Sequence, residues 1–321
     1  MKPFPVLICI MAFFSQLSAV TIDESRLLDS YYNKQKLPAV VPCRPVMKNK
    51  VFYLDLSLAG HFQSDIHYID SIDDLIDQRY NERSKKANAL KPEIYGVYQP
   101  KTERLIFRLS NRISGHFYQR YSAENRWWND FQALLGVGGK LWRWVIAPEF
   151  RYEEHSGGQL YFREHYRMFG EYKHFGLEYW FDLYNFYIQD DRDAKETSVA
   201  PYFIFQNSRS TMKLGCRSTH RRSRSECYSF NEIIPFLEVA VRKDRWEFEG
   251  SASMPDKNFK EILAGDQRMR EDNVTRYNMR ISHLLHFGRF FIDYGTEAKR
   301  SNLERYTFNQ RTADVGWTYS F

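Results

Sequence analysis

Residues 314–321 read Asp-Val-Gly-Trp-Thr-Tyr-Ser-Phe, with apolar or aromatic side chains at every second position. Successive side chains of a β-strand point to opposite faces, so this stretch predicts a strand with one aromatic face. The other face carries small and polar residues. A soluble barrel would turn the aromatic face inward, whereas a barrel in a membrane would turn it toward lipid.

The composition favours a membrane barrel over a soluble one. Aromatic residues make up 17% of the chain, with 22 Tyr and 25 Phe, which suits the aromatic girdles of a transmembrane β-barrel. Beyond the N-terminus no run of about 18 apolar residues occurs, so a helical membrane protein is excluded. The net charge of +6 is spread over mixed signs, which argues against nucleic acid as a partner.

Ending on Phe321 after such a strand resembles the C-terminal recognition signal of bacterial outer-membrane barrels. The same alternation recurs upstream, where the row from Leu105 to Phe117 is apolar and the intervening row contains Arg108, Arg112 and His116. In lipid the polar row must point inward. We therefore predict an all-β, antiparallel transmembrane barrel in the bacterial outer membrane.

Alternating short and long connections predict the strand number. Short periplasmic turns are expected near Pro100–Lys101, Gly138–Lys140, Lys173–His174, Ser208–Arg209, Lys243–Asp244 and Phe287–Gly288, and long polar extracellular loops between them. The breaks give 14 strands, or 12 if the weak strands near Glu93–Tyr98 and Thr211–Cys216 do not form. The expected long loops are Gln119–Asn129, Glu154–Gln159, Asp190–Glu196, Arg217–Glu232, Met254–Asn273 and Lys299–Gln310.

Three segments are expected along the chain. Residues 1–19 have the charge, apolar core and small residues of a signal peptide, and residues 20–50 form an N-terminal periplasmic segment rich in proline. Residues 51–321 form the barrel. Cys216 and Cys227 flank a basic stretch and would form a disulfide in an oxidising periplasm, the alternative being two free thiols.

Charges of both signs fall on the rows predicted to face the lumen. Two interpretations remain open: a lumen plugged by ion pairs and hydrogen bonds, and a selective pore. The residues concerned are Asp55, Arg108, Arg112, Glu149, Arg151, Arg163, Arg167, Glu238, Glu247, Glu249 and Arg280.

The hairpin that follows Leu141 contains Tyr-Glu-Glu-His-Ser-Gly-Gly at residues 152–158. This stretch resembles the outer membrane phospholipase A family, which reads Tyr, Asn, His, any residue, Ser, Asn, Gly. Residues 163–168 and 306–310 also resemble motifs of that family. The resemblance runs loosely from about Val51 to Phe321. It implies a phospholipase A1/A2-type serine hydrolase that cleaves the acyl esters of phospholipid, with calcium assisting.

Transferred position by position, the resemblance makes Ser156 the nucleophile. The position of the family's base falls on Glu154, and the orienting Asn falls near Phe162, which has no polar group. His155 is an alternative base, although its parity places it on the lumen face unless a bulge redirects it. The mismatches motivate the alternative of a non-catalytic barrel acting as a pore or a structural protein.

Phospholipid and lipopolysaccharide of the outer membrane are the expected partners, and a homodimer is a further possibility. The basic stretch from Arg217 to Arg224 is expected in an outer loop, where its charges would meet lipopolysaccharide phosphates. His165 is expected in the internal polar network.

Overall fold

The computed structural model describes residues 52–64, 87–100, 105–118, 125–139, 141–155, 160–186, 193–207, 209–262, 268–285, 288–303 and 307–320. The expected signal peptide, the periplasmic segment and Cys43 lie outside these residues. The described chain is almost entirely strand, with one short 3-10 helix, η3 (Glu226–Tyr228). None of its helical residues forms a segment long and apolar enough to cross a membrane.

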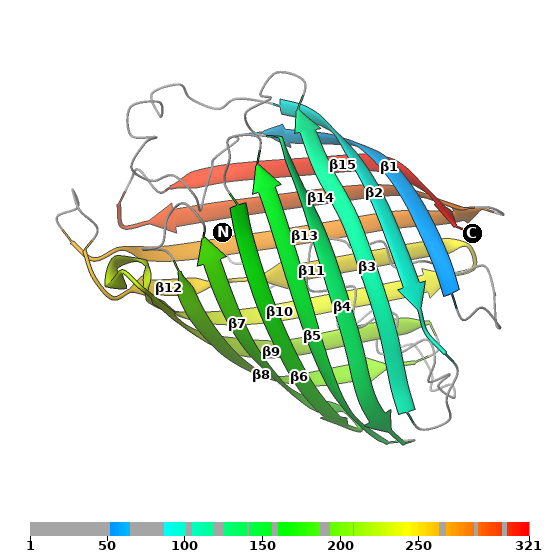
Figure 1. The fold of residues 1–321 in the computed structure, drawn as a ribbon, viewed down its shortest axis with the longest axis horizontal. Coiled ribbons are helices and arrows are strands. Elements are labelled where there is room, and N and C mark those ends of the chain that lie inside the picture. Colours follow the sequence, from blue (N-terminus) through cyan, green and yellow to red (C-terminus); the bar gives the residue numbers. More distant parts are fainter. Residues whose placement is uncertain are drawn as a thin grey trace, which may run out of the picture.

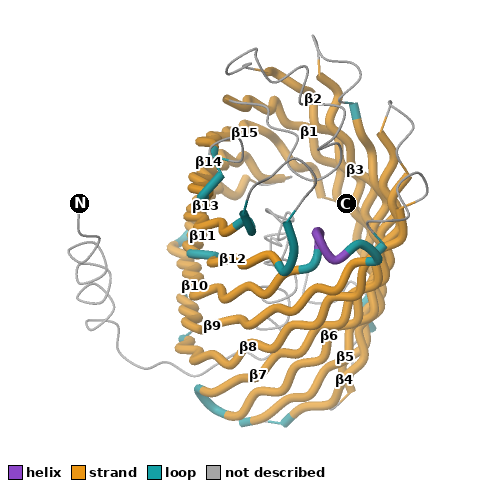
Figure 2. The backbone as a smooth tube through the Cα atoms, turned by 90° about the vertical axis from the view of Figure 1, so that its left-hand side faces the viewer, coloured by secondary structure: helices purple, strands orange, loops and turns teal. Residues whose placement is uncertain are grey.

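The strands form one antiparallel wall that closes on itself (Figures 1 and 2). They are β1 (Phe52–Ser64), β2 (Ala87–Tyr98), β3 (Leu105–Tyr118), β4 (Arg126–Gly138), β5 (Trp142–His155), β6 (Leu160–Tyr172), β7 (Phe175–Phe186), β8 (Ala194–Gln206), β9 (Ser210–Ser223), β10 (Phe230–Lys243), β11 (Trp246–Ser253), β12 (Asp256–Phe259), β13 (Glu271–Leu285), β14 (Gly288–Ser301) and β15 (Phe308–Ser320).

The barrel has 14 strand positions, because β11 and β12 share one of them. Both pair with β10 on one side and with β13 on the other. Met254 and Pro255 separate them, and proline has no N–H to donate to the ladder. Its carbonyl still accepts from the Val274 amide at 2.8 Å. The predicted count of 14 is confirmed, since β2 and β9 contain both of the strands that were in doubt.

The last strand closes the ring against the first. Val315 stands opposite Gly60, Trp317 opposite Leu58 and Tyr319 opposite Leu56. On β15, Val315 and Tyr319 are exposed while Asp314 and Thr318 are buried, so the predicted alternation is confirmed. Closure leaves no free sheet edge, which is the condition for a sheet to cross lipid.

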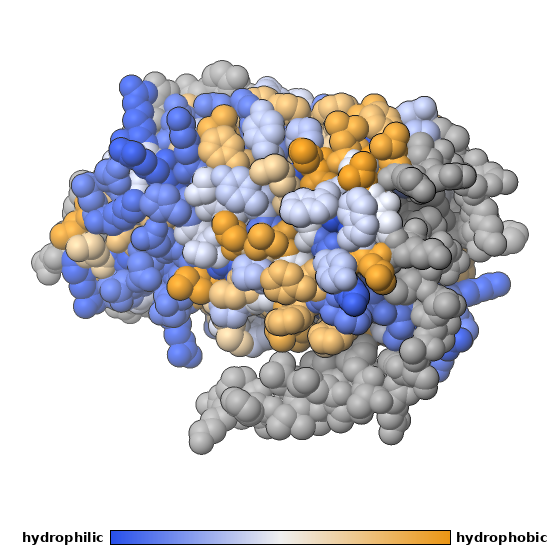
Figure 3. Space-filling model, turned by 90° about the horizontal axis from the view of Figure 1, so that it is seen from below, coloured by the Kyte–Doolittle hydropathy of each residue, from blue (hydrophilic) through white to orange (hydrophobic). Residues whose placement is uncertain are grey.

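The outside of the barrel is apolar over the middle of its strands. Leu105, Trp144, Phe203 and Ile233 are 62%, 61%, 55% and 56% exposed, although such side chains are usually buried. Figure 3 shows apolar residues over the middle of the face in view, with hydrophilic residues gathered at the left-hand end. An apolar belt of this size on a closed barrel is a lipid-facing surface.

Most strands have 12 to 15 residues, which is longer than the hydrocarbon layer requires. They therefore extend beyond the membrane and shorten the predicted loops. The expected loop Arg217–Glu232 is wrong in its first part, because β9 continues to Ser223 and leaves residues 224–229 as the connection. The loop Met254–Asn273 likewise contains β12. The two-residue turn at Lys173–His174 is confirmed, and the one expected at Lys243–Asp244 lies one residue later.

Glycines on the inner wall make room for aromatic rings from neighbouring strands. A Cβ at Gly215 would lie 2.6 Å from the ring of Phe236, and one at Gly316 would lie 2.6 Å from Phe291. At Gly176 a Cβ would overlap the ring of Tyr202. The rings lie flat against the wall because these positions have no side chain.

We expect Gly176→Ala to destabilise the barrel by about 1–3 kcal/mol, because the added methyl group overlaps the rigid Tyr202 ring. Urea unfolding in lipid vesicles, followed by tryptophan fluorescence, measures the change. Gly60→Ala is the control, since its Cβ would meet nothing closer than 4.0 Å. Equal stability of the two variants would contradict the close packing of the Tyr202 ring against Gly176.

Candidate functional site

The candidate site is the inner wall of the barrel. The residues predicted to face the lumen do so: Asp55, Arg108, Arg167 and Arg280 are buried, and the inward carboxylates of β10 and β11 are partly exposed. Their neighbours on each strand point to lipid. The inner wall thus carries the charge of the membrane-spanning region, as the alternation requires.

Glu178 of β7 is at the centre of one ion cluster. Its carboxylate accepts from Arg167 of β6 at 2.8 Å and from Lys213 of β9 at 2.6 Å, and its side chain is 0% exposed. Two cations on one fully buried carboxylate compensate the cost of removing it from water. The pair Arg143–Glu171, at 2.6 Å, lies nearer the periplasmic turns.

Asp182 lies four residues further toward the outer end of β7 than Glu178 and is at the centre of a second cluster. Arg163 donates to it at 2.5 Å, and the His165 Nδ1 lies 2.7 Å from the same carboxylate. The prediction that His165 belongs to the internal network is confirmed. A bidentate pair on the next strands joins Arg151 to Asp130, at 2.5 and 2.8 Å.

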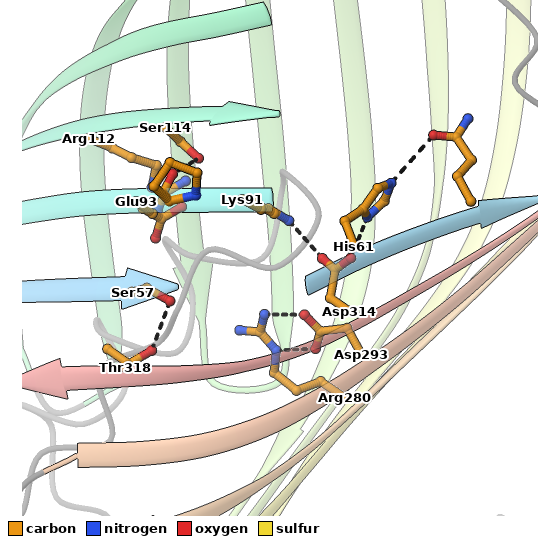
Figure 4. Close-up of polar contacts among 12 residues, drawn as sticks. Ser57, His61, Lys91, Glu93, Arg112, Ser114, Arg280, Asp293, Asp314 and Thr318 are labelled. Atoms are coloured by element: carbon orange, nitrogen blue, oxygen red, sulfur yellow. Dashed lines mark hydrogen bonds and ion pairs between the residues drawn. The ribbon is translucent and has the colours of Figure 1, made fainter. Parts of the chain in front are cut away.

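A third cluster lies where the last strand meets the first (Figure 4). Asp314 of β15 contacts the His61 Nδ1 of β1 and accepts from the Lys91 Nζ of β2 at 2.8 Å. The His61 ring stacks on His116, with centroids 4.8 Å apart. Arg280 and Asp293 form a bidentate pair on the adjoining strands.

The described ion pairs run along the wall and not across the lumen. Each one is local or joins strands that are neighbours or next but one, as in Lys213–Glu178 over β8 and Arg289–Glu247 over β13. Among the described residues, no ion pair joins opposite sides of the ring. The predicted pairing of lumen charges is confirmed, and the pairs among the described residues lie along the wall.

An apolar cluster covers the inner wall of β4 to β10 on the side of the short turns. It contains aromatic rings seated over glycines, with Tyr202 donating from its hydroxyl to Glu171 at 2.7 Å. The members are Leu134, Val145, Ala147, Phe169, Trp180, Ala200, Tyr202, Ile204 and Phe236. The lumen wall is therefore polar toward the outer end and partly apolar toward the periplasm.

The residues predicted to be catalytic lie at the outer end of β5. Ser156 falls outside the described residues, and of His155 only the backbone is described. Glu154 is on the lipid-facing row, where the Tyr152 hydroxyl lies 3.4 Å from its carboxylate. Phe162 of β6 stands opposite Tyr152 of β5 and Asn185 of β7. Among the described residues no group of three His, Cys, Asp or Glu side chains has the arrangement of a metal site.

The basic stretch from Arg217 to Arg224 is mostly strand and not loop, so the expectation for it is wrong in part. His220 and Arg222 face outward near the outer end, whereas Arg217 and Arg221 point into the lumen. Contact of the outward pair with lipopolysaccharide stays a prediction. Sequence reasoning missed the inward pair, which the alternation of β9 would have revealed once the strand was extended.

The expected disulfide is absent, since Cys216 and Cys227 are both free. Cys216 is on the exposed face of β9, seven residues before the strand ends, or about 23 Å along it. Cys227 lies in η3, where its sulfur is 3.0 Å from the Ser225 hydroxyl. A disulfide requires Cα atoms within about 7 Å, so the length of β9 keeps the thiols apart.

No protein-family model and no curated protein sequence matches the chain. The fold is similar to solved outer-membrane proteins. A bacterial polysaccharide outer membrane secretin has a TM-score of 0.48 at 11% identity, covering 84% of this chain and 98% of that one. OccAB3 of Acinetobacter baumannii has 0.45 at 8%, covering 84% and 99%. A loop-deletion mutant of OmpT of Vibrio cholerae has 0.44 at 7%, covering 84% and 98%.

The closed 14-strand ring and its lipid-facing belt define the class of this protein: it is an antiparallel β-barrel of the bacterial outer membrane. The resemblance to phospholipase A rests on sequence motifs alone.

We expect Glu178→Gln to destabilise the barrel by about 3–5 kcal/mol, because it leaves Arg167 and Lys213 with a neutral partner in a buried site. Glu297→Gln is the matched control. It removes the pair with Arg276, whose side chain is 43% exposed, and should cost less than about 1 kcal/mol. Urea unfolding in vesicles compares them, and a similar loss in both variants would contradict the central role of Glu178.

Proposed function

We propose that the protein is a passive pore for small hydrophilic solutes in the outer membrane. The observation that supports this proposal is the course of the described ion pairs, which lie along the wall and do not cross the lumen. Side chains that pair with neighbouring strands lie along the wall, and in a pore the axis of the barrel would hold water. A barrel that served only as a structural protein would be stabilised by ion pairs that cross the lumen.

The wall of β10 and β11 adds support. Its inward residues include Glu238 and Glu249, each of intermediate exposure although each lies within a membrane-spanning strand. A partly exposed carboxylate on the inner face needs water beside it, since burial without a partner is costly. Polar walls of this kind line the aqueous channels of other barrels.

We expect a cysteine at Ser251, which faces inward, to react with a charged, membrane-impermeant thiol reagent and to lower the conductance. Ala252→Cys is the matched control, because it is the next residue and faces lipid. Both are made in a background in which Cys43, Cys216 and Cys227 are replaced by Ser. Planar-bilayer recording measures single-channel current before and after the reagent.

The expected result is a conducting wild type, partial block of the Ser251 variant and no change in the Ala252 variant. No conductance from folded protein would overturn the pore and favour a structural barrel. Equal reaction of both cysteines would contradict the assigned faces of β11.

We also propose, for separate testing, that Ser156 hydrolyses acyl esters of outer-leaflet phospholipid. The outward position of Glu154 supports it, because Glu154 precedes Ser156 by two residues in the sequence, as the base does in the phospholipase A motif. Glu154 or His155 would take the proton of the serine hydroxyl, as a weak nucleophile requires. Calcium assistance and a homodimer remain part of this proposal.

Fluorophosphonate labelling tests the ester hydrolase. We expect the wild type in mixed micelles with calcium to be labelled and to release fatty acid, and Ser156→Ala to lose both. Ser218→Ala, an exposed serine on the lipid face of β9, should behave as wild type. Identical fatty-acid release from the Ser156→Ala variant and the wild type would end the proposal.

A further inference from the structure

The inward row of β9, like that of β3, has cations and no acid, but Arg112 of β3 has a carboxylate partner, Glu93, at 3.6 Å. Every second residue from Thr211 to Ser223 faces inward. Three of these carry positive charge, and the rest are glycine or hydroxyl residues. The row consists of Thr211, Lys213, Gly215, Arg217, Thr219, Arg221 and Ser223.

Aromatic rings, not carboxylates, hold the two arginines of this row. The Arg217 guanidinium carbon lies 3.7 Å from the centre of the Trp180 ring. That of Arg221 lies 4.8 Å from Tyr184 and 5.8 Å from Phe230. A guanidinium stacked on a ring keeps its N–H groups at its edges, where they remain able to donate.

The arginines have no ion pair within 4 Å in the part of the chain that the structure describes, and the Nε of each is buried without a hydrogen-bond partner. Buried donors without partners are rare and point to a ligand or water. Glu196 stands directly opposite Arg221 in register, yet the guanidinium lies over the rings instead. Arg217 has no inward acid beside it on β8, because Ser198 and Ala200 occupy that wall.

The other acids near this row already serve other cations. Glu178 binds Arg167 and Lys213, is 0% exposed, and forms no ion pair with Arg217 within 4 Å among the described residues. Glu232 of β10 lies 3.7 Å from the Lys257 ammonium, which itself sits 3.9 Å from the centre of the Phe230 ring. Arg217 and Arg221 each keep an unpaired Nε donor and have no carboxylate within 4 Å among the described residues.

We propose that Arg217 and Arg221 form a binding track for small anionic solutes that carry a carboxylate or phosphate group. The two side chains share one face of one strand, four residues or about 13 Å apart, along the direction in which a solute would cross the membrane. This spacing exceeds the Debye length of about 8–10 Å at physiological ionic strength, so the two guanidinium groups act as two successive and separate binding positions for an anion. The planar guanidinium group can donate two parallel N–H hydrogen bonds to either a carboxylate or a phosphate. This inference rests on the proposed pore.

The test is the reversal potential in a potassium chloride gradient across a planar bilayer. We expect wild type to pass chloride more readily than potassium, and Arg217→Gln and Arg221→Gln each to lower that ratio about threefold, as one charge beside a salt-filled path would. Inorganic phosphate should reduce the chloride current of wild type and have little effect on the double variant.

Arg222→Gln is the matched control, because it removes the same charge from the adjacent residue on the outer face, 76% exposed. It should keep the wild-type ratio, and Arg217→Lys should keep most of it. Conductance without anion preference, or an equal loss in the Arg222 variant, would overturn the track while leaving the pore. Absence of conductance from folded wild type would overturn both.

Discussion

The hydrocarbon layer supplies no hydrogen bonds, and this constraint governs the rest of the structure. Every backbone N–H and C=O in the membrane must find a partner within the sheet, so the sheet must close. Pairing of β15 with β1 achieves closure. Once the ring is closed, the side-chain period of two leaves one row for lipid and one for the lumen. The exposed Trp144 and the buried Arg143, adjacent on β5, are consequences of that single requirement.

The alternation of residues along each strand was enough to predict which side chains face lipid and which face the lumen. It was not enough to predict which side chains contact each other. Alternation at Leu105–Phe117 and at Val315–Tyr319 gave the correct faces, because it depends only on neighbours in sequence. Which carboxylate each arginine meets depends on register between strands, which no local pattern contains. Thus Arg163 was correctly placed in the lumen, whereas its partner Asp182 was not identified. The site residue Ser156 lies outside the described residues, so its role is still a prediction.

Two local features misled the sequence reasoning for physical reasons. Polar residues such as Arg217 and His220 read as loop because polarity was equated with solvent, although a strand that extends beyond the membrane can carry them on either face. The break at Pro255 divides one strand in two without ending it, since the carbonyls around it continue to accept from β13. Both cases concern the outer rim, where lipid no longer dictates which residues are tolerated.

The placement of the ion pairs also bears on how such a chain assembles. Charges on neighbouring strands, such as Arg151 with Asp130, meet as soon as their hairpin forms. Asp314 is different, because His61 and Lys91 come from the opposite end of the strand order. Its charge stays uncompensated until the two ends of the sheet join. This contact therefore forms, and stabilises the closed ring, only at the final step of assembly.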